Sequence, residues 1–189
     1  MRSYSVYLVK GTNLEQAKQV FGSAEIVDGS DWMRCCFTKD DEPPEDEVLV
    51  GDESLTKAAS ERLGEVVFVY GDTSVDGFVY EHSRNGEIVR KLVWFPMLDD
   101  DWNSGWICTE GEAETWETSL FGEDRLERFL AIERDRHNDE GKETEFEEYA
   151  ESVREDWAMK RIETGNRYPE CDGTVALLVE RKYGVEREG

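Results

Sequence analysis

His82, which follows Glu81, is the first candidate for acid–base chemistry. A catalytic histidine needs a nucleophile or a substrate proton within hydrogen-bond reach, and a partner that orients its ring. Adjacent residues of a strand point to opposite faces, so Glu81 does not orient His82 and is expected to pair with Arg90. The simpler interpretation is a histidine on a sheet face beside Tyr80. The other histidine, His137, lies among charged residues and is expected to be exposed.

The segment from Asp99 to Glu110 has the spacing of a calcium-binding loop. Asp99, Asp101, Asn103 and Glu110 stand at positions 1, 3, 5 and 12 of an EF-hand loop, where oxygen ligands are expected. Position 6 should be glycine and is Ser104 instead, and the preceding residues predict a strand rather than a helix. An acidic hairpin loop is therefore favoured, and a weak cation site of another type is the alternative.

Tryptophans supply the third candidate site. Four of the six lie between residues 94 and 116, and exposed tryptophan is enriched where proteins bind partners. With so few aliphatic residues in the chain, most of these rings are expected in the core, and Trp102 is the best candidate for exposure. The candidate ligand-binding residues are Tyr80, His82, Arg90, Trp94, Trp102 and Trp106.

Charge and missing motifs exclude several functions. The chain has 22 Lys and Arg against 45 Asp and Glu, a net charge of −23, whereas nucleic acids and anionic membranes require clustered cations. No phosphate-binding glycine loop, nucleophile elbow or zinc-protease motif occurs, so no cofactor or metal is expected. Apolar runs are too short to span a bilayer or to serve as a signal peptide. The four cysteines form no C-x-x-C pair, which favours the cytoplasm, and the oligomeric state stays open.

These candidates need a scaffold, which begins with two strand-and-helix pairs. Ser3–Lys10 alternates in the manner of a strand, and Asn13 is placed to cap a short helix that ends at Gly22. A second strand is expected at Trp32–Thr38. After an acidic loop with two prolines, a second helix is expected at Glu53–Leu63.

A β-meander is predicted in the middle of the chain. Its strands are expected at Glu65–Tyr70, Asp76–Ser83, Glu87–Phe95 and Trp106–Glu110. The second and third strands flank an Asn-Gly pair, the strongest short hairpin signal.

A two-residue turn at Asn85-Gly86 fixes the register of this hairpin, because paired positions then sum to 171. Arg84 is expected opposite Glu87, and Glu81 opposite Arg90. Opposite charges that face each other favour this register.

The last third of the chain is predicted to be mainly helical. One is expected from Gly122 to about Arg136, and a second from a capping box at Thr144 to Gly165. The second has apolar residues at helical spacing, namely Phe146, Tyr149, Ala150, Val153 and Trp157. Thr174–Tyr183 is expected to be a final strand. The sequence thus predicts a single α+β domain over residues 1–189, with parts at 1–64, 65–121 and 122–189. It combines a mainly antiparallel sheet, a central meander, helices packed on one face and a helical C-terminal part.

The centre of the chain also resembles a family of uncharacterised bacterial proteins. The matching segments are Asp72–Asp76, Tyr80–His82, Asn85-Gly86 with Ile88–Arg90, and Glu110–Glu117, and the resemblance extends over Glu65–Phe121, about a third of the chain. It implies a compact, strand-rich core. The family has no assigned activity, so it implies no catalytic residues.

Two functions of different classes remain open, and the first is favoured. A small acidic cytoplasmic protein can bind a basic protein through charge complementarity, as an immunity protein or inhibitor does. The alternative is an enzyme or small-ligand-binding protein with its site between the sheet and the C-terminal helices. An acidic surface that serves only solubility is a third possibility.

Overall fold

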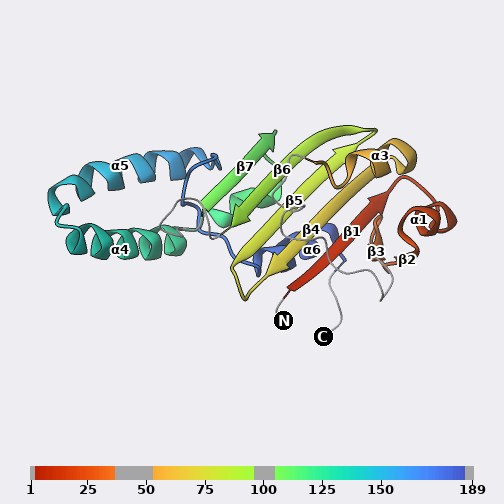
Figure 1. Ribbon diagram of the computed structural model, residues 1–189, viewed down its shortest axis with the longest axis horizontal. Helices are drawn as coiled ribbons and strands as arrows, with labels where there is room; N and C mark the ends of the chain where they lie inside the picture. Colours follow the sequence, from red (N-terminus) through yellow and green to blue (C-terminus); the bar gives the residue numbers. More distant parts are fainter. Residues whose placement is uncertain (1–2, 37–52, 96–104, 186–189) are drawn as a thin grey trace.

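The predicted antiparallel sheet is present in the computed structural model, which describes residues 3–36, 53–95 and 105–185 (Figure 1). Within these residues seven strands are arranged in the order β2-β3-β1-β4-β5-β6-β7. The strands are β1 (Ser3–Lys10), β2 (Ser23–Ile26), β3 (Met33–Cys36), β4 (Glu65–Asp72), β5 (Gly77–Arg84), β6 (Glu87–Phe95) and β7 (Gly105–Gly111). The helices are α1 (Leu14–Phe21), α3 (Lys57–Leu63), the 3-10 helix η1 (Thr115–Leu120), α4 (Glu123–Asp139), α5 (Glu143–Met159) and α6 (Val175–Tyr183).

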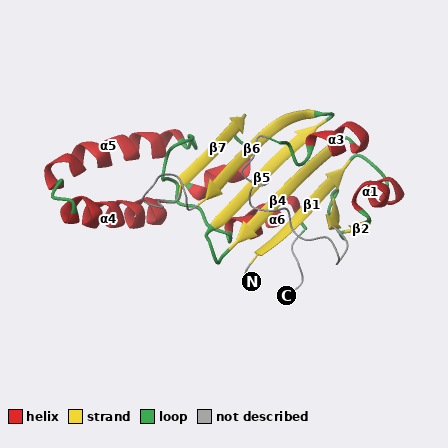
Figure 2. Cartoon of the chain, in the orientation of Figure 1, coloured by secondary structure: helices red, strands yellow, loops and turns green. Residues whose placement is uncertain are grey.

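Helices cover both faces of the sheet, so the prediction of one covered face is wrong. On one face, Val67 and Val69 belong to a core shared with η1 and α4–α6, and α6 passes behind the strands in Figure 2. On the other face, Val66 and Phe68 pack in a second core with α1 and α3. The physical reason is that β4 is apolar at every position from Val66 to Tyr70, which is typical of a strand buried on both sides.

The expected final strand at Thr174–Tyr183 is the helix α6. Val175, Ala176 and Val179 are buried along one side of it, and this spacing fits a helix. A short apolar run does not by itself distinguish a buried strand from a buried helix. The helix ends at Gly184, whose φ of 66° is easy only for glycine.

The first helix follows the prediction closely, since the Asn13 side chain accepts a hydrogen bond from the Gln16 amide at 3.0 Å. The second helix is shorter than expected and begins at Lys57. The expected strand at Trp32–Thr38 is described as β3, and the sequence did not indicate β2. The acidic loop at Asp40–Glu47 lies outside the described residues.

A β-bulge changes the expected register of the central hairpin. Arg84 pairs with Glu87 as predicted, but the register shifts by one residue between His82 and Ser83. Arg90 therefore lies opposite His82, and Glu81 lies opposite Lys91 rather than Arg90. Val89 is the extra residue, so the bulge moves Arg90 onto the sheet face that carries His82.

The helices α4 and α5 form an antiparallel pair that extends away from the sheet along the longest axis of the molecule (Figure 1). We call residues 123–159 the arm. Its helices confirm the prediction of a helical C-terminal part, although α5 begins at Glu143 with Lys142 as its N-cap and ends at Met159. The predicted capping box at Thr144 is therefore wrong. No helix among the described residues has the length and apolar character to cross a membrane.

Candidate functional site

His82 is held between two carboxylates on the face of the sheet that η1 and α6 cover. Its Nδ1 lies 2.6 Å from Glu114 Oε1, and its Nε2 lies 2.9 Å from Glu65 Oε1. Glu65 is at the start of β4, and Glu114 is the residue before η1. The His82 side chain is 7% exposed, so this Glu65–His82–Glu114 clamp is an internal feature of the fold.

Two tyrosines extend the clamp to α6. Tyr80 donates a hydrogen bond to Glu114 Oε1 at 2.8 Å, and Tyr183 donates one to Glu114 Oε2 at 3.1 Å. The two hydroxyl oxygens are 2.6 Å apart. Burial, and after it the neighbouring Glu114 carboxylate, raises the pKa of Tyr183. The pKa of Tyr80 is raised by burial first, and then by the neighbouring Tyr183 and Glu114. Both tyrosines therefore remain neutral hydrogen-bond donors.

The two carboxyl groups respond to these donors. Burial alone would raise the pKa of Glu114, but hydrogen bonds from His82, Tyr80 and Tyr183 outweigh it and lower that pKa. At Glu65 burial again acts to raise the pKa, but hydrogen bonds from Arg84 and His82 outweigh it and lower the pKa. The Nε of Arg84 donates to Glu65 at 3.1 Å. The clamp thus stabilises two partly buried carboxylates in their charged form.

Arg90, the third predicted polar site residue, is fully engaged next to the clamp. Its Nε and Nη2 donate to the two carboxylate oxygens of Glu117 at 2.9 and 2.7 Å, and its Nη1 donates to the Gly111 carbonyl at 3.0 Å. Both side chains are almost completely buried. Glu117 also accepts a hydrogen bond from the Glu114 amide at 2.7 Å, which links the ion pair to the clamp.

The tryptophans contribute to the core rather than to a shared site. Trp94 and Trp106 are buried and pack edge to face with ring centroids 5.2 Å apart. Trp102 lies outside the described residues. Trp32, which the sequence did not mark as a site residue, approaches His82 with ring centroids 6.3 Å apart and contacts Tyr183 with ring centroids 4.8 Å apart. Trp32 and His82 are far apart in the sequence, and it is the sheet order β3-β1-β4-β5 that brings them together. No local pattern could therefore have predicted this contact.

A hollow of about 400 Å³ lies beside this cluster, and its lining includes Ser30, Asp31, Trp32 and Tyr183. His82 is not among the residues that line it. Both ring nitrogens of His82 face carboxylates, so in this arrangement neither is available to a substrate. The geometry therefore favours a structural role for the clamp over catalysis.

The calcium-loop hypothesis falls mostly outside the described residues. Asp99, Asp101, Asn103 and Ser104 are not described, and Glu110 is an exposed residue of β7. Within residues 3–36, 53–95 and 105–185, no group of three or more His, Cys, Asp or Glu side chains is arranged to hold a metal ion.

Glu81 forms a second buried polar cluster on the opposite face. Its Oε1 accepts hydrogen bonds from the Ser54 hydroxyl at 2.6 Å, the Thr56 amide at 2.8 Å and the Thr56 hydroxyl at 2.7 Å. Its Oε2 lies 3.5 Å from Lys91 Nζ. Thr56 is the N-cap of α3, so this carboxylate anchors the beginning of that helix and stabilises its positive dipole end.

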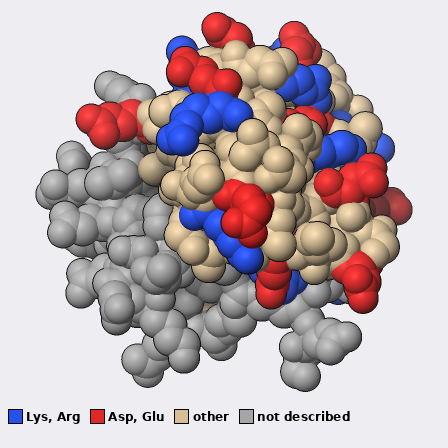
Figure 3. Space-filling view, turned by 90° about the vertical axis from the view of Figure 1, so that its right-hand side faces the viewer, with Lys and Arg blue, Asp and Glu red and all other residues tan. Residues whose placement is uncertain are grey.

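The arm concentrates acidic charge on one helix. The sequence of α5 contains seven acidic residues and one arginine. Its exposed glutamates are Glu143, Glu145, Glu147, Glu148, Glu151 and Glu155. At the end of the molecule that carries α1 and α3, by contrast, acidic and basic residues are interspersed (Figure 3). The strongest one-signed surface on a described helix is therefore the outer face of α5.

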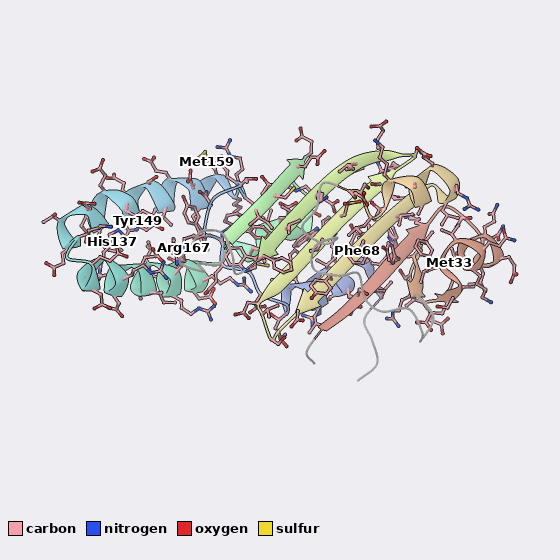
Figure 4. All side chains as sticks on the ribbon, viewed as in Figure 1. Met33, Phe68, His137, Tyr149, Met159 and Arg167 are labelled. Atoms are coloured by element: carbon pink, nitrogen blue, oxygen red, sulfur yellow. The ribbon has the colours of Figure 1, made fainter. Side chains whose placement is uncertain are left out.

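The interior of the arm is polar as well as aromatic. Glu133 is 3% exposed, and its Oε1 lies 3.4 Å from Arg136 and 3.3 Å from Arg167. Tyr149 hydrogen-bonds the same carboxyl group, and its ring lies 5.1 Å from that of His137. His137, Tyr149 and Arg167 lie between α4 and α5 in Figure 4. His137 is thus partly buried, and the prediction that it is exposed is wrong.

The comparisons with known proteins assign no relative to this chain. No protein-family model, curated protein or solved structure matches it. The resemblance of Glu65–Phe121 to uncharacterised bacterial proteins stays a prediction. The function is therefore inferred from the residues and their arrangement.

The lowered pKa values of the clamp carboxylates predict how stability depends on acid. A carboxyl group whose pKa is lower in the folded state stabilises the fold above its unfolded pKa, and this contribution is lost as the pH falls through the folded value. We expect the free energy of unfolding of Glu114→Gln to lie below that of the wild type at pH 7, with a difference that shrinks between pH 5 and pH 2. Urea denaturation at a series of pH values measures it. A constant difference would contradict the charge contribution of Glu114.

Proposed function

We propose that this protein is a protein-binding module of the cytoplasm that presents the outer face of α5 to a basic surface on its partner. The observation that carries the proposal is the set of exposed glutamates on this helix, on an arm that projects from the sheet. An immunity- or inhibitor-like role belongs to this class. The resemblance of the central segment to uncharacterised bacterial proteins supports a bacterial setting.

The spacing of the glutamates supports an extended contact. Glu145, Glu148 and Glu155 fall on one stripe of α5, opposite the buried side that carries Val153. Residues three and four apart on a helix are neighbours. This spacing joins Glu145 to Glu148 and, through the exposed Glu151, Glu148 to Glu155, so the stripe repels itself unless cations approach it. A basic partner removes this repulsion, and the attraction speeds association at low salt.

The stripe ends in an apolar residue. Met159 is 57% exposed and lies on the side of α5 that faces away from α4 (Figure 4). Methionine adapts its shape to different apolar partners. We therefore expect a partner surface with lysines and arginines beside an apolar spot.

The arm is built to hold its shape while it presents this face. The Glu133 carboxylate connects α4 to Arg167, which follows α5 in the chain. Trp157 packs edge to face on Phe121 with ring centroids 5.4 Å apart, which joins the base of α5 to the end of η1. A preorganised face loses less conformational entropy on binding than a flexible acidic segment does.

The test compares the proteins that three versions of the chain capture from the lysate of its native organism. These are the wild type, an arm variant with Glu145, Glu148 and Glu155 changed to Gln, and a control variant with Glu15, Glu61 and Glu87 changed to Gln. Both variants remove three exposed carboxylates. With roughly 0.2–1 kcal/mol for each exposed charge pair, we expect the arm variant to bind the partner about tenfold more weakly.

The partner is expected to be basic, to bind the control variant almost as well as the wild type, and to be released as salt rises above physiological concentration. Equal capture by the arm variant and the wild type would contradict the proposal. A partner whose binding is indifferent to salt would contradict it as well.

A further inference from the structure

The clamp around His82 is complete only when both ring nitrogens carry hydrogens. Glu65 and Glu114 are ionised acceptors with lowered pKa values, and each lies within 3 Å of a different ring nitrogen. A neutral imidazole has one N–H donor and one lone pair. In the neutral form, one of the two contacts would therefore set a nitrogen lone pair against a partly buried carboxylate oxygen.

The groups that face the imidazole are known on every side. They are Glu65 from β4, Tyr80 from β5 (the strand of His82 itself), Glu114 before η1, Tyr183 from α6, and Arg90, opposite His82 on β6. Arg84 pairs with Glu65, and Glu117 pairs with Arg90. Trp32 covers the ring from the β3 side, and Lys10 Nζ lies 5.8 Å from the Trp32 ring centroid. The two tyrosines are held neutral and the arginines stay charged, so among the groups that contact the two carboxylates the imidazole is the one that can release a proton when the pH rises.

We propose that the clamp is a pH-sensitive latch: His82 holds Glu114 while it carries both ring protons, and loss of the Nδ1 proton releases the Tyr183 end of α6 from the sheet. Glu114 binds His82 on one side and the hydroxyl of Tyr183 on the other. When its contact with His82 becomes repulsive, Glu114 moves away from the ring and breaks the hydrogen bond to Tyr183.

The direction of the effect follows from proton linkage. The closed form keeps one more proton on His82 than the open form does, so rising pH favours opening. One linked proton raises the opening equilibrium constant by at most about tenfold for each pH unit. The latch is thus closed at low pH, and it loosens as the pH rises.

Hydrogen exchange of backbone amides between pH 6 and pH 9, corrected for the intrinsic pH dependence of exchange, measures the opening. We expect protection of the last turn of α6 to fall by up to about tenfold for each pH unit over part of this range, while amides of β4 and β5 keep their protection. Nitrogen NMR of the His82 ring in the same samples is expected to show two N–H groups in the closed form.

Two variants separate the latch from general loosening. In Glu114→Gln the side-chain amide can donate to a neutral imidazole, so α6 is expected to stay protected at pH 9 with no pH dependence. In Tyr183→Phe the hydrogen bond to Glu114 is absent, so the last turn of α6 is expected to be less protected at every pH, and its protection should not depend on pH. A His82 ring with a single N–H at pH 6, a wild-type α6 whose protection ignores pH, or an unchanged pH dependence in Glu114→Gln would each overturn the proposal.

Discussion

Replacing Glu81 with alanine is expected to lower the free energy of unfolding by about 3–5 kcal/mol, the usual cost of removing one partner of a buried ion pair. The carboxylate is fully buried, accepts three hydrogen bonds from Ser54 and Thr56, and lies 3.5 Å from Lys91 Nζ. Its loss removes the carboxylate beside the buried Lys91, whose Nζ also donates to the Glu53 carbonyl at 3.3 Å, and it removes the anchor of α3. Urea denaturation measures the loss.

Two further variants serve as controls for the Glu81→Ala result. Glu87→Ala removes an exposed carboxylate from the same hairpin and is expected to change stability by no more than about 0.5 kcal/mol. Glu81→Gln keeps an oxygen that can accept hydrogen bonds but loses the charge, so it should fall between the other two. A loss of less than about 1 kcal/mol in Glu81→Ala would show that the buried cluster does not anchor α3.

Replacing Gly111 with alanine is expected to destabilise the protein by about 2–5 kcal/mol, because the change combines backbone strain with a clash. The residue has a φ of +82°, and an added Cβ would lie 2.0 Å from the Val89 carbonyl oxygen. A side chain in left-handed backbone costs about 1–2 kcal/mol, and overpacking adds about 1–3 kcal/mol. Gly111 pairs with Arg90 just past the bulge, so the clash falls where the bulge positions that arginine.

Gly141→Ala is the matched control for this prediction. Gly141 also has a positive φ, of +70°, but nothing lies within 4 Å of the position of an added Cβ. It should therefore show the backbone strain without the clash, at a cost of about 1–2 kcal/mol. Equal losses in the two variants, measured by urea denaturation, would contradict the close packing of β7 against the bulge.

The sequence predicted most of the scaffold through local signals. The Asn13 cap, the Asn-Gly turn and the helical spacing of Phe146, Ala150, Val153 and Trp157 each depend on residues a few positions apart, and the elements that they predict are confirmed. The helix at 175–183 was missed because five apolar residues in a row fit either a strand or a helix. Burial of both sheet faces could have been read from the unbroken apolar run of β4.

The candidate site was predicted less well, because its contacts join distant parts of the chain. Tyr80 and His82 were correctly placed on one face, but Glu65, Glu114 and Tyr183 come from three other elements. The bulge at Val89 also defeated the simple register rule, which placed Arg90 on the wrong face. A bulge has no reliable signal in the local sequence, yet it shifts the register of every pair of the hairpin beyond it.

The structure shows where the unbalanced acidic charge lies. A net charge of −23 suggests a uniformly acidic surface, yet carboxylates such as Glu81, Glu117 and Glu133 are buried beside cations. Such pairs serve the interior of the fold. The unbalanced charge that remains on a described helix is greatest on α5, which is why the proposed function is assigned to that face.

Carboxyl footprinting of the complex tests this assignment most directly. The captured partner is mixed with the protein, exposed carboxylates are labelled with a carbodiimide and an amine, and labelling is compared with that of the free protein. The account predicts that Glu145, Glu148 and Glu155 lose label in the complex, while Glu15 and Glu61 keep theirs. Unchanged labelling on α5, with protection elsewhere, would contradict the proposal that this face binds the partner.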